Sequence, residues 1–254
     1  MCDFVGPSAS GRGWRQAAAR WVRRTLTHPT EQPLRVLITA GPTREPIDDV
    51  RFISNRSSGQ MGLALARAAA EAGHDVTLLL GPVLVPATLS DGDALRVERF
   101  TTTAGLRALL DEHFPACDVL VMAAAVADYR LAAPRAGKAP RSGGMRLELE
   151  PTPDLVAGVA ATKRPDQRVI AFALEEAAVL EERAAEKMRR KGVDAIVANP
   201  LATMDSGRVA AVLLTPDGER HEPPATAGSG TDGPGQSKAA FARWLVAWID
   251  RSPG

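Results

Sequence analysis

Residues 38–62 read ITAGPTREPIDDVRFISNRSSGQMG, and they decide how the fold is predicted. Residues 34–39, which overlap the start of this stretch, form a short apolar run rich in branched side chains, as in a buried parallel strand. From Gly62 onward apolar residues recur at helical spacing until Gly73, which predicts the end of a helix. Residues 76–80 are apolar again. The three segments therefore predict a βαβ unit with a parallel return.

The polar end of this stretch lies at the predicted start of the helix. Ser57, Ser58, Gly59 and Gly62 would surround the helix N-terminus, where free backbone N–H groups and the helix dipole favour an anion. The alternative is that the glycines only allow tight packing of the helix on the strand. The glycines follow the strand by about 20 residues, too far for the dinucleotide fingerprint G-x-G-x-x-G, and a Walker loop is absent.

The composition is that of an ordinary globular protein. The 254 residues are enough for one large α/β domain, and 45% of them are hydrophobic and 24% charged. A net charge of +1 gives no global field that would attract nucleic acid. Two cysteines, Cys2 and Cys117, and four scattered histidines predict neither a disulfide framework nor a metal site. We therefore expect a protein of a reducing, cytoplasmic compartment.

Residues 1–33 are predicted as a basic extension before a single domain over residues 34–254. Residues 1–30 carry five arginines against Asp3 alone, with tryptophans interleaved. A basic amphipathic helix there could touch a membrane or act as a targeting leader, but it lacks a continuous apolar segment for secretion or spanning. The alternative is an accessory helix or a frayed extension, and we expect no membrane partner.

Along the rest of the chain, helices alternate with about six apolar strands, which predicts a Rossmann-like, open, mostly parallel sheet with helices on both faces. The run 118–127 reads as a strand that ends at Asp128, with small alanines near its end. In doubly wound sheets ligands gather at the carboxyl ends of strands, where Gly41, Asp128 and residues 172–175 would converge. Asp128 could instead cap a turn.

A long basic segment follows that strand. Residues 129–144 read as irregular, for which a solvated loop is the default interpretation, and their length makes them a candidate lid or an arm that contacts another subunit. Residues 145–150 alternate as in a strand with one wet face. Further on, Thr152 is the expected N-cap of a helix, with Pro153 at its first position.

Two features are predicted near the C-terminus. Lys187 and Lys191 lie four residues apart on one helix, where they either complement the helix dipole or offset the charge of bound phosphates. Residues 208–218 predict a small β-hairpin, and Ser237 is expected to cap a final amphipathic helix.

The quoted stretch resembles the signature of the phosphopantothenoylcysteine synthetase (phosphopantothenate–cysteine ligase) family. The likeness extends from about residue 34 to the C-terminus and includes AAAVADYR at 123–130, TPDLVAGVAA at 152–161, IAFALE at 170–175 and KMRRKGVDAIVAN at 187–199. The resemblance implies a ligase of coenzyme A biosynthesis. Such an enzyme joins 4′-phosphopantothenate to L-cysteine, with CTP as co-substrate in the usual bacterial branch, through an acyl-cytidylate that forms with release of pyrophosphate.

The resemblance also implies roles for particular residues. Asn55 would hold and polarise the acyl intermediate as a neutral amide donor, and Ala124 and Ala125 would border 4′-phosphopantothenate. Ser57, Gly59 and Gly62 would receive the nucleotide phosphates. The other implied nucleotide contacts are Asp128, Lys138, Thr152, Pro153, Asp154, Leu155, Phe172, Lys187 and Lys191.

Two positions depart from the family's pattern. The arm reads RAGKAP where the family has a lysine-rich K-x-K-K run, so Lys138 alone inherits the role in the cysteine-dependent half-reaction. Gln60 stands where the family commonly has lysine. The resemblance further implies a homodimer contacted through the arm, a magnesium–nucleotide complex, and a decarboxylase on a separate polypeptide, since residues 1–33 are too few for that domain.

Two other functions remain as alternatives. A nicotinamide-dependent reductase of the same fold class is disfavoured by the missing fingerprint and by the lack of a Tyr-x-x-x-Lys pair, because Tyr129 is followed four positions later by Ala133. A non-catalytic member that only binds nucleotide is disfavoured by the retention of Asn55 and Lys138.

Overall fold

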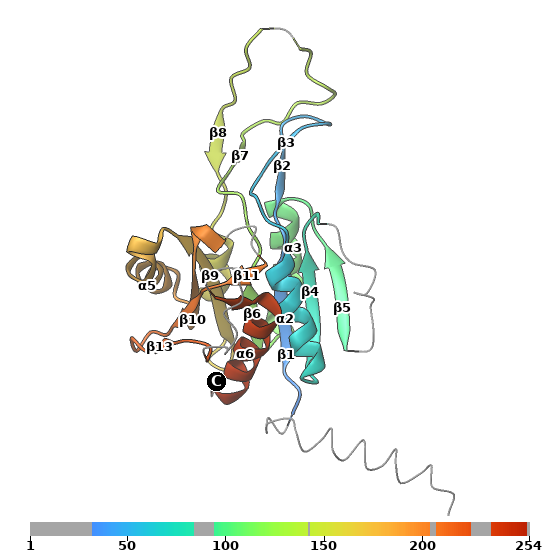
Figure 1. Cartoon of the computed structure of the whole chain (residues 1–254). Coiled ribbons are helices and arrows are strands. Elements are labelled where there is room, and N and C mark those ends of the chain that lie inside the picture. The colour runs from blue at the N-terminus through green and yellow to red at the C-terminus, as the bar shows by residue number, and fades with distance from the viewer. Residues whose placement is uncertain (1–31, 84–93, 142, 204–206, 225–234, 253–254) are drawn as a thin grey trace, which may run out of the picture. The chain divides into compact units, whose positions relative to one another are not determined.

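The computed structural model describes residues 32–83, 94–141, 143–203, 207–224 and 235–252 (Figure 1). The chain divides between Glu31 and Gln32 into two units, and the described residues belong to the second. The predicted basic extension 1–33 lies almost wholly outside the described residues. Within the described part of the chain, none of the helices is long and apolar enough to cross a membrane.

The elements alternate between strands and helices. The helices are α2 (Gln60–Glu71), α3 (Thr103–His113), α4 (Leu155–Ala160), α5 (Leu180–Lys191) and α6 (Lys238–Arg251), with short 3₁₀ turns η1 (Phe114–Ala116), η2 (Ala177–Val179) and η3 (Leu201–Thr203). The strands are β1 (Arg35–Ala40), β2 (Arg44–Pro46), β3 (Phe52–Ser54), β4 (Asp75–Leu80), β5 (Leu95–Arg99), β6 (Val119–Met122), β7 (Tyr129–Leu131), β8 (Leu149–Pro151), β9 (Arg168–Glu175), β10 (Ala195–Pro200), β11 (Arg208–Val209), β12 (Val212–Leu214), β13 (Arg220–His221) and β14 (Gln236–Ser237).

The predicted architecture is confirmed. The main sheet has eight strands in the order β13-β12-β10-β9-β6-β1-β4-β5. The pairs from β10 through β5 are parallel, whereas β12 at one edge pairs antiparallel with both β10 and β13. The chain runs from β1 outward to β5 and then returns to β6 on the other side of β1. This reversal is the point at which doubly wound sheets bind ligands.

Helices cover both faces of the sheet, and β1 is therefore buried on both sides. Val36 and Ile38 pack in the cluster that includes α2 and α6, whereas Leu37 packs in the cluster that includes α3, α4 and α5. Successive residues of a strand point to opposite faces, so a run that is apolar throughout is what a strand between two helix layers requires. The same pattern led to the correct prediction of β1 and β4.

The packing of α2 on β1 explains one of the glycines. A Cβ atom at Gly62 would lie 2.4 Å from the Cβ of Ala40, so even alanine would push the helix away from the strand. Gly59 has φ 70°, a left-handed conformation that favours glycine, and it is the N-cap of α2. The alternative in which these glycines serve tight packing is therefore correct for Gly62.

The predicted strand 118–127 is too long. β6 ends at Met122. Beyond it the Ala125 N–H still donates to the carbonyl of Gly41 at 2.9 Å, but two neighbouring amides bond to side-chain hydroxyls. The Ala124 N–H donates to Oγ1 of Thr39 at 3.0 Å, and the Ala127 N–H donates to Oγ1 of Thr43 at 2.9 Å. Residues 123–127 are thus held beside the loop that follows β1 without being part of the sheet.

The segment predicted as irregular contains a strand. β7 pairs antiparallel with β8, and β8 covers only the end of the predicted strand 145–150. Residues 129–151, here called the arm, project beyond the carboxyl end of the sheet together with the hairpin formed by β2 and β3 (Figure 1). The pairing was missed because β7 is only three residues long, too short for its alternation to mark a strand.

The predicted cap of α4 is wrong by two residues. Asp154 is the N-cap and accepts from the Ala157 N–H at 3.1 Å, while the Thr152 hydroxyl donates to the carbonyl of Ala127 at 2.5 Å. Thr152 therefore ties this turn to the segment after β6. Pro153, predicted at the first helical position, precedes the cap. The cap of α6 by Ser237 is confirmed. The hairpin predicted over 208–218 is confirmed in part, since β12 pairs with β13 but β11 pairs with β14.

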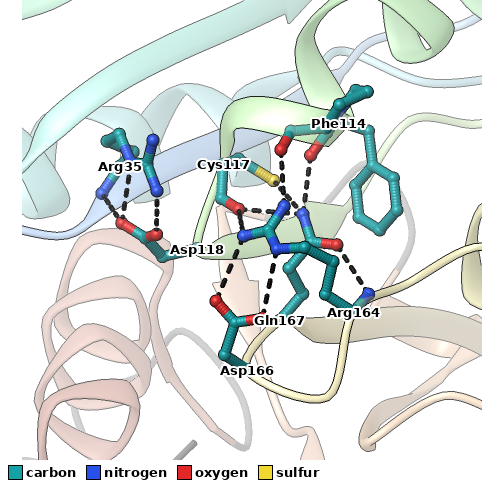
Figure 2. Close-up of polar contacts among 8 residues, drawn as sticks. Arg35, Phe114, Cys117, Asp118, Arg164, Asp166 and Gln167 are labelled. Atoms are coloured by element: carbon teal, nitrogen blue, oxygen red, sulfur yellow. Dashed lines mark hydrogen bonds and ion pairs between the residues drawn. The ribbon is translucent and has the colours of Figure 1, made fainter.

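A polar cluster joins the amino ends of the central strands (Figure 2). Asp118, just before β6, accepts from the backbone N–H of Arg35 at 2.8 Å and from its guanidinium at 2.5 and 3.1 Å. Gln167, just before β9 and 3% exposed, donates to the carbonyls of Phe114 and Cys117 at 2.7 and 2.9 Å. These residues, with Arg164 and Asp166, are called the amino-end cluster below.

Candidate functional site

A cleft of about 910 Å³ opens at the carboxyl ends of the parallel strands, on both sides of the point where the topology reverses. Its walls come from seven parts of the chain, most of them distant in sequence. They are residues 54–62, 122–129, 151–156 and 172–174, and the side chains of Lys187, Arg190, Lys191, Asn199, Thr203 and Lys238.

The structure brings together all the predicted site residues except Lys138. The residues that line the cleft are Asn55, Ser57, Gly59, Gly62, Ala124, Ala125, Asp128, Thr152, Pro153, Asp154, Leu155, Phe172, Lys187 and Lys191. Asp128 lines the cleft, and its backbone carbonyl accepts from the Thr152 N–H at 2.9 Å beside the β7–β8 pair.

Asn55 follows β3 directly and crosses toward the segment after β6. Its side-chain Nδ2 donates to the carbonyl of Val126 at 2.8 Å, which fixes the orientation of the amide. A carboxamide has two N–H donors and one acceptor oxygen. One N–H therefore holds the Asn55 side chain in place. This bond also sets the orientation of the remaining N–H and of the oxygen in the cleft.

The start of α2 forms one wall of the cleft. Gly59 supplies no side chain that could accept from the first turn of the helix, and it follows Ser57, whose Oγ lies 3.4 Å from the Gly59 nitrogen. Backbone N–H groups at such an uncapped helix start point outward and favour an anion. The predicted anion site therefore coincides with a wall of a real cleft.

Lysines from α5 form the opposite wall. Lys187 is paired with Glu175 at the end of β9, and the Nζ of Lys191 lies 2.9 Å from Oδ1 of Asp154. Burial raises the pKa of the Asp154 carboxyl, but the hydrogen bonds from Lys191 and from the Ala157 N–H outweigh it, and the pKa is lowered. The two ammonium groups are thus held at the cleft by carboxylates that an incoming phosphate would partly replace.

Lys138 is the exception among the predicted residues. It lies in the arm, outside the residues that line the cleft, and its neighbours Gly137 and Ala139 are bonded to the tip of the β2–β3 hairpin. The sequence places Lys138 by resemblance alone, and the structure of one chain does not bring it to the cleft.

Several cleft residues were missed by the sequence analysis. Arg190 lies in the same basic run as Lys187 and could have been found from that run. The Nζ of Lys238, at the start of α6, lies 3.4 Å from Oε1 of Gln60, although 178 positions separate the two residues. Thr203 donates to Oδ1 of Asn199 at 2.9 Å after β10. No local pattern marks these last contacts, because only the fold brings α6 and η3 to the cleft.

A built metal centre is not found in the part of the chain that the structure describes, where no three histidine, cysteine, aspartate or glutamate side chains come together as metal ligands would. The cleft itself is lined by more lysines and arginines than carboxylates. Its chemistry suits an anionic ligand more than a bare cation.

The model of the family described as DNA/pantothenate metabolism flavoprotein C-terminal domain matches residues 32–250. The chain belongs to this family. The match confirms the family resemblance that was seen in the sequence.

The similar curated proteins are longer than this chain. It is 41% identical over 195 residues to the coenzyme A biosynthesis bifunctional protein CoaBC of Escherichia coli strain K12, which covers 74% of this chain and 47% of that protein. It is 43% identical over 182 residues to a protein named cysteine/cysteine sulfinic acid decarboxylase from an unknown prokaryotic organism, with 70% and 50% covered. The chain thus spans about half the length of these relatives.

Solved structures of two proteins share the fold. The C-terminal domain of a bifunctional CoaBC superposes with a TM-score of 0.69 at 32% identity, covering 86% of this chain and 95% of that one. A Cab2 mutant in complex with phosphopantothenate-cysteine has a TM-score of 0.68 at 17% identity, covering 95% and 94%. The second likeness concerns the fold alone.

Proposed function

We propose that the protein is a phosphopantothenate–cysteine ligase of coenzyme A biosynthesis. It would join 4′-phosphopantothenate and L-cysteine with CTP and give phosphopantothenoylcysteine, CMP and pyrophosphate. The observation that carries the proposal is the cleft at the topological reversal, which is lined by Asn55, by the start of α2 and by the lysines of α5. Family membership and the similarity to bifunctional CoaBC proteins support the same activity.

The first half-reaction would take place between the two walls of the cleft. A carboxylate oxygen of 4′-phosphopantothenate attacks the α-phosphorus of CTP, and the bond between the α- and β-phosphates breaks to release pyrophosphate. The N-terminus of α2 and the ammonium groups of Lys187 and Lys191 stabilise the phosphate charge. Asp128, the turn 152–155 and Phe172 would hold the nucleoside, with Phe172 stacking on the base or ribose.

The second half-reaction would use the amide of Asn55. The amine of cysteine attacks the acyl carbon, a C–N bond forms and CMP leaves. An N–H of Asn55 can donate to the oxyanion that develops on the acyl oxygen, because Val126 already fixes the amide. Ala124 and Ala125 would leave room for the pantothenate chain beside this group.

Lys138 would act in the second half-reaction from a dimer. The arm and the β2–β3 hairpin expose apolar side chains, among them Phe52, Tyr129 and Leu149, of which 47, 55 and 45% are exposed. A second copy of the chain could cover these side chains and bring an arm to a cleft. The homodimer is therefore part of the proposal, and its test is the mass of the protein in solution at micromolar concentration.

Magnesium would enter with the nucleotide. The described residues offer no cluster of carboxylates or histidines as a built metal centre, whereas the phosphates of CTP are themselves oxygen ligands of the kind Mg²⁺ prefers. Bound in that way, the ion would neutralise phosphate charge, and Ser57 and the first turn of α2 would bind the remaining phosphate oxygens.

One experiment separates this function from the alternatives. Purified protein is given 4′-phosphopantothenate and Mg²⁺ with CTP or ATP, with and without cysteine, and pyrophosphate release is measured together with the mass of the product. We expect release with CTP, and a product heavier by one cysteine only when cysteine is present. Absence of release with either nucleotide would favour a binding-only protein.

Two companion measurements sharpen that result. Thermal shift should show stabilisation by CTP, since a ligand that binds only the folded state raises its stability, and stabilisation by NADPH instead would favour a reductase. The Lys138→Gln variant should still release pyrophosphate but fail to couple cysteine. Full coupling by this variant would remove Lys138 from the mechanism.

A further inference from the structure

Lys138 lies between two residues whose backbones are tied to the tip of the β2–β3 hairpin. On one side, the Gly137 N–H donates to Oδ2 of Asp49 at 2.8 Å, and the Gly137 carbonyl accepts from the Asp49 N–H at 3.4 Å. Gly137 has φ 71°, so its backbone takes a conformation that leaves both groups facing Asp49. One neighbour of Lys138 is therefore bonded through both its donor and its acceptor.

The other neighbour is bonded in the same way. The Ala139 N–H donates to Oδ2 of Asp48 at 3.1 Å, and the Ala139 carbonyl accepts from Nη2 of Arg51 at 2.7 Å. Ala139 is 8% exposed, whereas Lys138 is exposed. The chain on both sides of Lys138 is thus fixed while its own side chain remains in solvent.

The tip that makes these bonds is itself rigid. The side chain of Asp48 is fully buried, and its Oδ1 accepts from the N–H groups of Val50 at 2.9 Å and Arg51 at 2.8 Å. The hydrogen bond from Val50 is the largest of the influences on the Asp48 carboxyl, and with those from Ala139 and Arg51 it lowers the pKa to about 2 against the effect of burial. Asp48 is therefore ionised, and its two oxygens hold the hairpin tip and the arm together.

The hairpin also connects this tip to the cleft. β2 and β3 pair from Pro46 opposite Phe52 to Arg44 opposite Ser54, and the next residue is Asn55, anchored on Val126. One short antiparallel unit thus carries Asn55 at its base and the bonds to Gly137 and Ala139 at its tip. A movement of the hairpin would displace both groups.

We infer that Asp48 and Asp49 are positioning residues that hold Lys138 in the register needed for the cysteine-dependent half-reaction. The inference rests on the proposed ligase function and extends it, because it assigns a role to two side chains outside the cleft. Neither aspartate touches the substrates in this reading, and both act through the backbone of residues 137–139.

The test compares the two half-reactions in the Asp49→Ala variant. Asp49 is exposed, so its removal should leave the fold intact. We expect coupling to cysteine to slow by about tenfold, the size of effect that one misplaced group produces, while pyrophosphate release without cysteine changes by less than about twofold. Asp49→Asn should recover most of the coupling, because the amide oxygen can still accept from Gly137.

Two comparisons exclude a general effect on stability. Asp217→Ala is the matched control, since Asp217 is also exposed and also accepts from a backbone N–H, that of Glu219, but lies outside the arm and the cleft. Amide hydrogen exchange over residues 135–141 should be faster in Asp49→Ala than in Asp217→Ala.

The outcomes distinguish the inference from the function on which it rests. Absence of pyrophosphate release by the unaltered protein would overturn the ligase and the positioning role together. Full activity of the unaltered protein combined with unchanged coupling in Asp49→Ala would overturn the positioning role alone. Equal losses in both half-reactions would also overturn it, since they would show a structural defect.

Discussion

The two ends of the sheet carry similar charged residues and use them differently. At the amino ends, Asp118 is bonded to both the backbone and the guanidinium of Arg35, and Arg164 donates to the carboxylate of Asp166 (Figure 2). At the carboxyl ends, Lys187 and Lys191 are also paired with carboxylates, but both line a cleft of about 910 Å³. An ion pair by itself therefore does not indicate a binding site, whereas an ion pair beside a cavity does.

The partners of the polar groups also differ between the two ends. In the amino-end cluster, Gln167 donates to two backbone carbonyls and accepts from the Arg164 N–H at 2.9 Å, so its side-chain amide forms its hydrogen bonds with the backbone. In the cleft, the Asn55 side chain donates one hydrogen bond, to the carbonyl of Val126. The first arrangement joins loops to the strands, and the second holds an amide in place beside space for a ligand. The difference predicts which substitutions alter activity and which alter stability.

The largest effect is expected at Asn55. Asn55→Ala should lower the rate of product formation by about 100-fold or more, because removal of one donor to a developing oxyanion costs that much. Its unfolding midpoint should stay close to that of the unaltered protein, since the side chain is exposed and makes a single bond. Steady-state rates and urea unfolding check the two parts. A variant with full activity would remove Asn55 from the chemistry.

Gln167→Ala should show the opposite pattern. Its loss leaves the carbonyls of Phe114 and Cys117 without their buried donor, which should reduce the free energy of unfolding by about 2 kcal/mol. The rate per folded molecule at 25 °C should be unchanged, because the cluster lies at the far end of the strands from the cleft. Loss of activity in a fully folded Gln167→Ala protein would contradict the division between the two ends.

A smaller effect is expected for the lysines of α5. Lys187→Met and Lys191→Met should each raise the KM for the nucleotide by about tenfold, the worth of one charge-assisted contact to phosphate. Arg35→Met is the matched control, since it removes a paired cation from the amino-end cluster and should leave this KM unaltered. An equal rise in all three variants would point to a general electrostatic effect.

The smallest effect concerns pH. The hydrogen bond from the Arg35 side chain lowers the pKa of the Asp118 carboxyl, with burial acting against it. Because the folded pKa lies below the unfolded one, the pair stabilises the protein above the unfolded pKa, and this contribution is lost as pH falls through the folded pKa. Asp118→Asn should therefore cost about 1 kcal/mol or less at pH 7 and less still near pH 3, as measured by urea unfolding.

Elements whose pattern is local in the sequence could be predicted, whereas features that depend on contacts between distant residues could not. Buried on both sides, β1 and β4 have an apolar pattern that follows directly from their environment, and so they were predicted to within about a residue. β6 was predicted too long, because residues 123–127 remain apolar although the hydroxyls of Thr39 and Thr43 bind their amides. That competition lies between residues some 80 positions apart and leaves no local mark.

The candidate site shows the same division. The residues of continuous motifs, such as Ser57, Gly59 and Thr152, line one cleft. Lys238 and Thr203 line it too, but only the crossing of α6 and the end of β10 brings them there. The bonds from Asp48 and Asp49 to the arm were missed for a similar reason, since they join the hairpin tip to a segment about 90 residues further along.

The position of β1 at the centre of the sheet has a consequence for how the chain folds during synthesis. Val36 pairs with Val76 on one side and with Val119 on the other. As the chain leaves the ribosome at roughly 5–20 residues per second, β1, α2 and β4 are complete several seconds before β6 emerges. Until then the second edge of β1 presents unpaired backbone groups, so the nascent chain passes through a state open to wrong strand pairing, and the long-range closure by β6 should limit its folding rate.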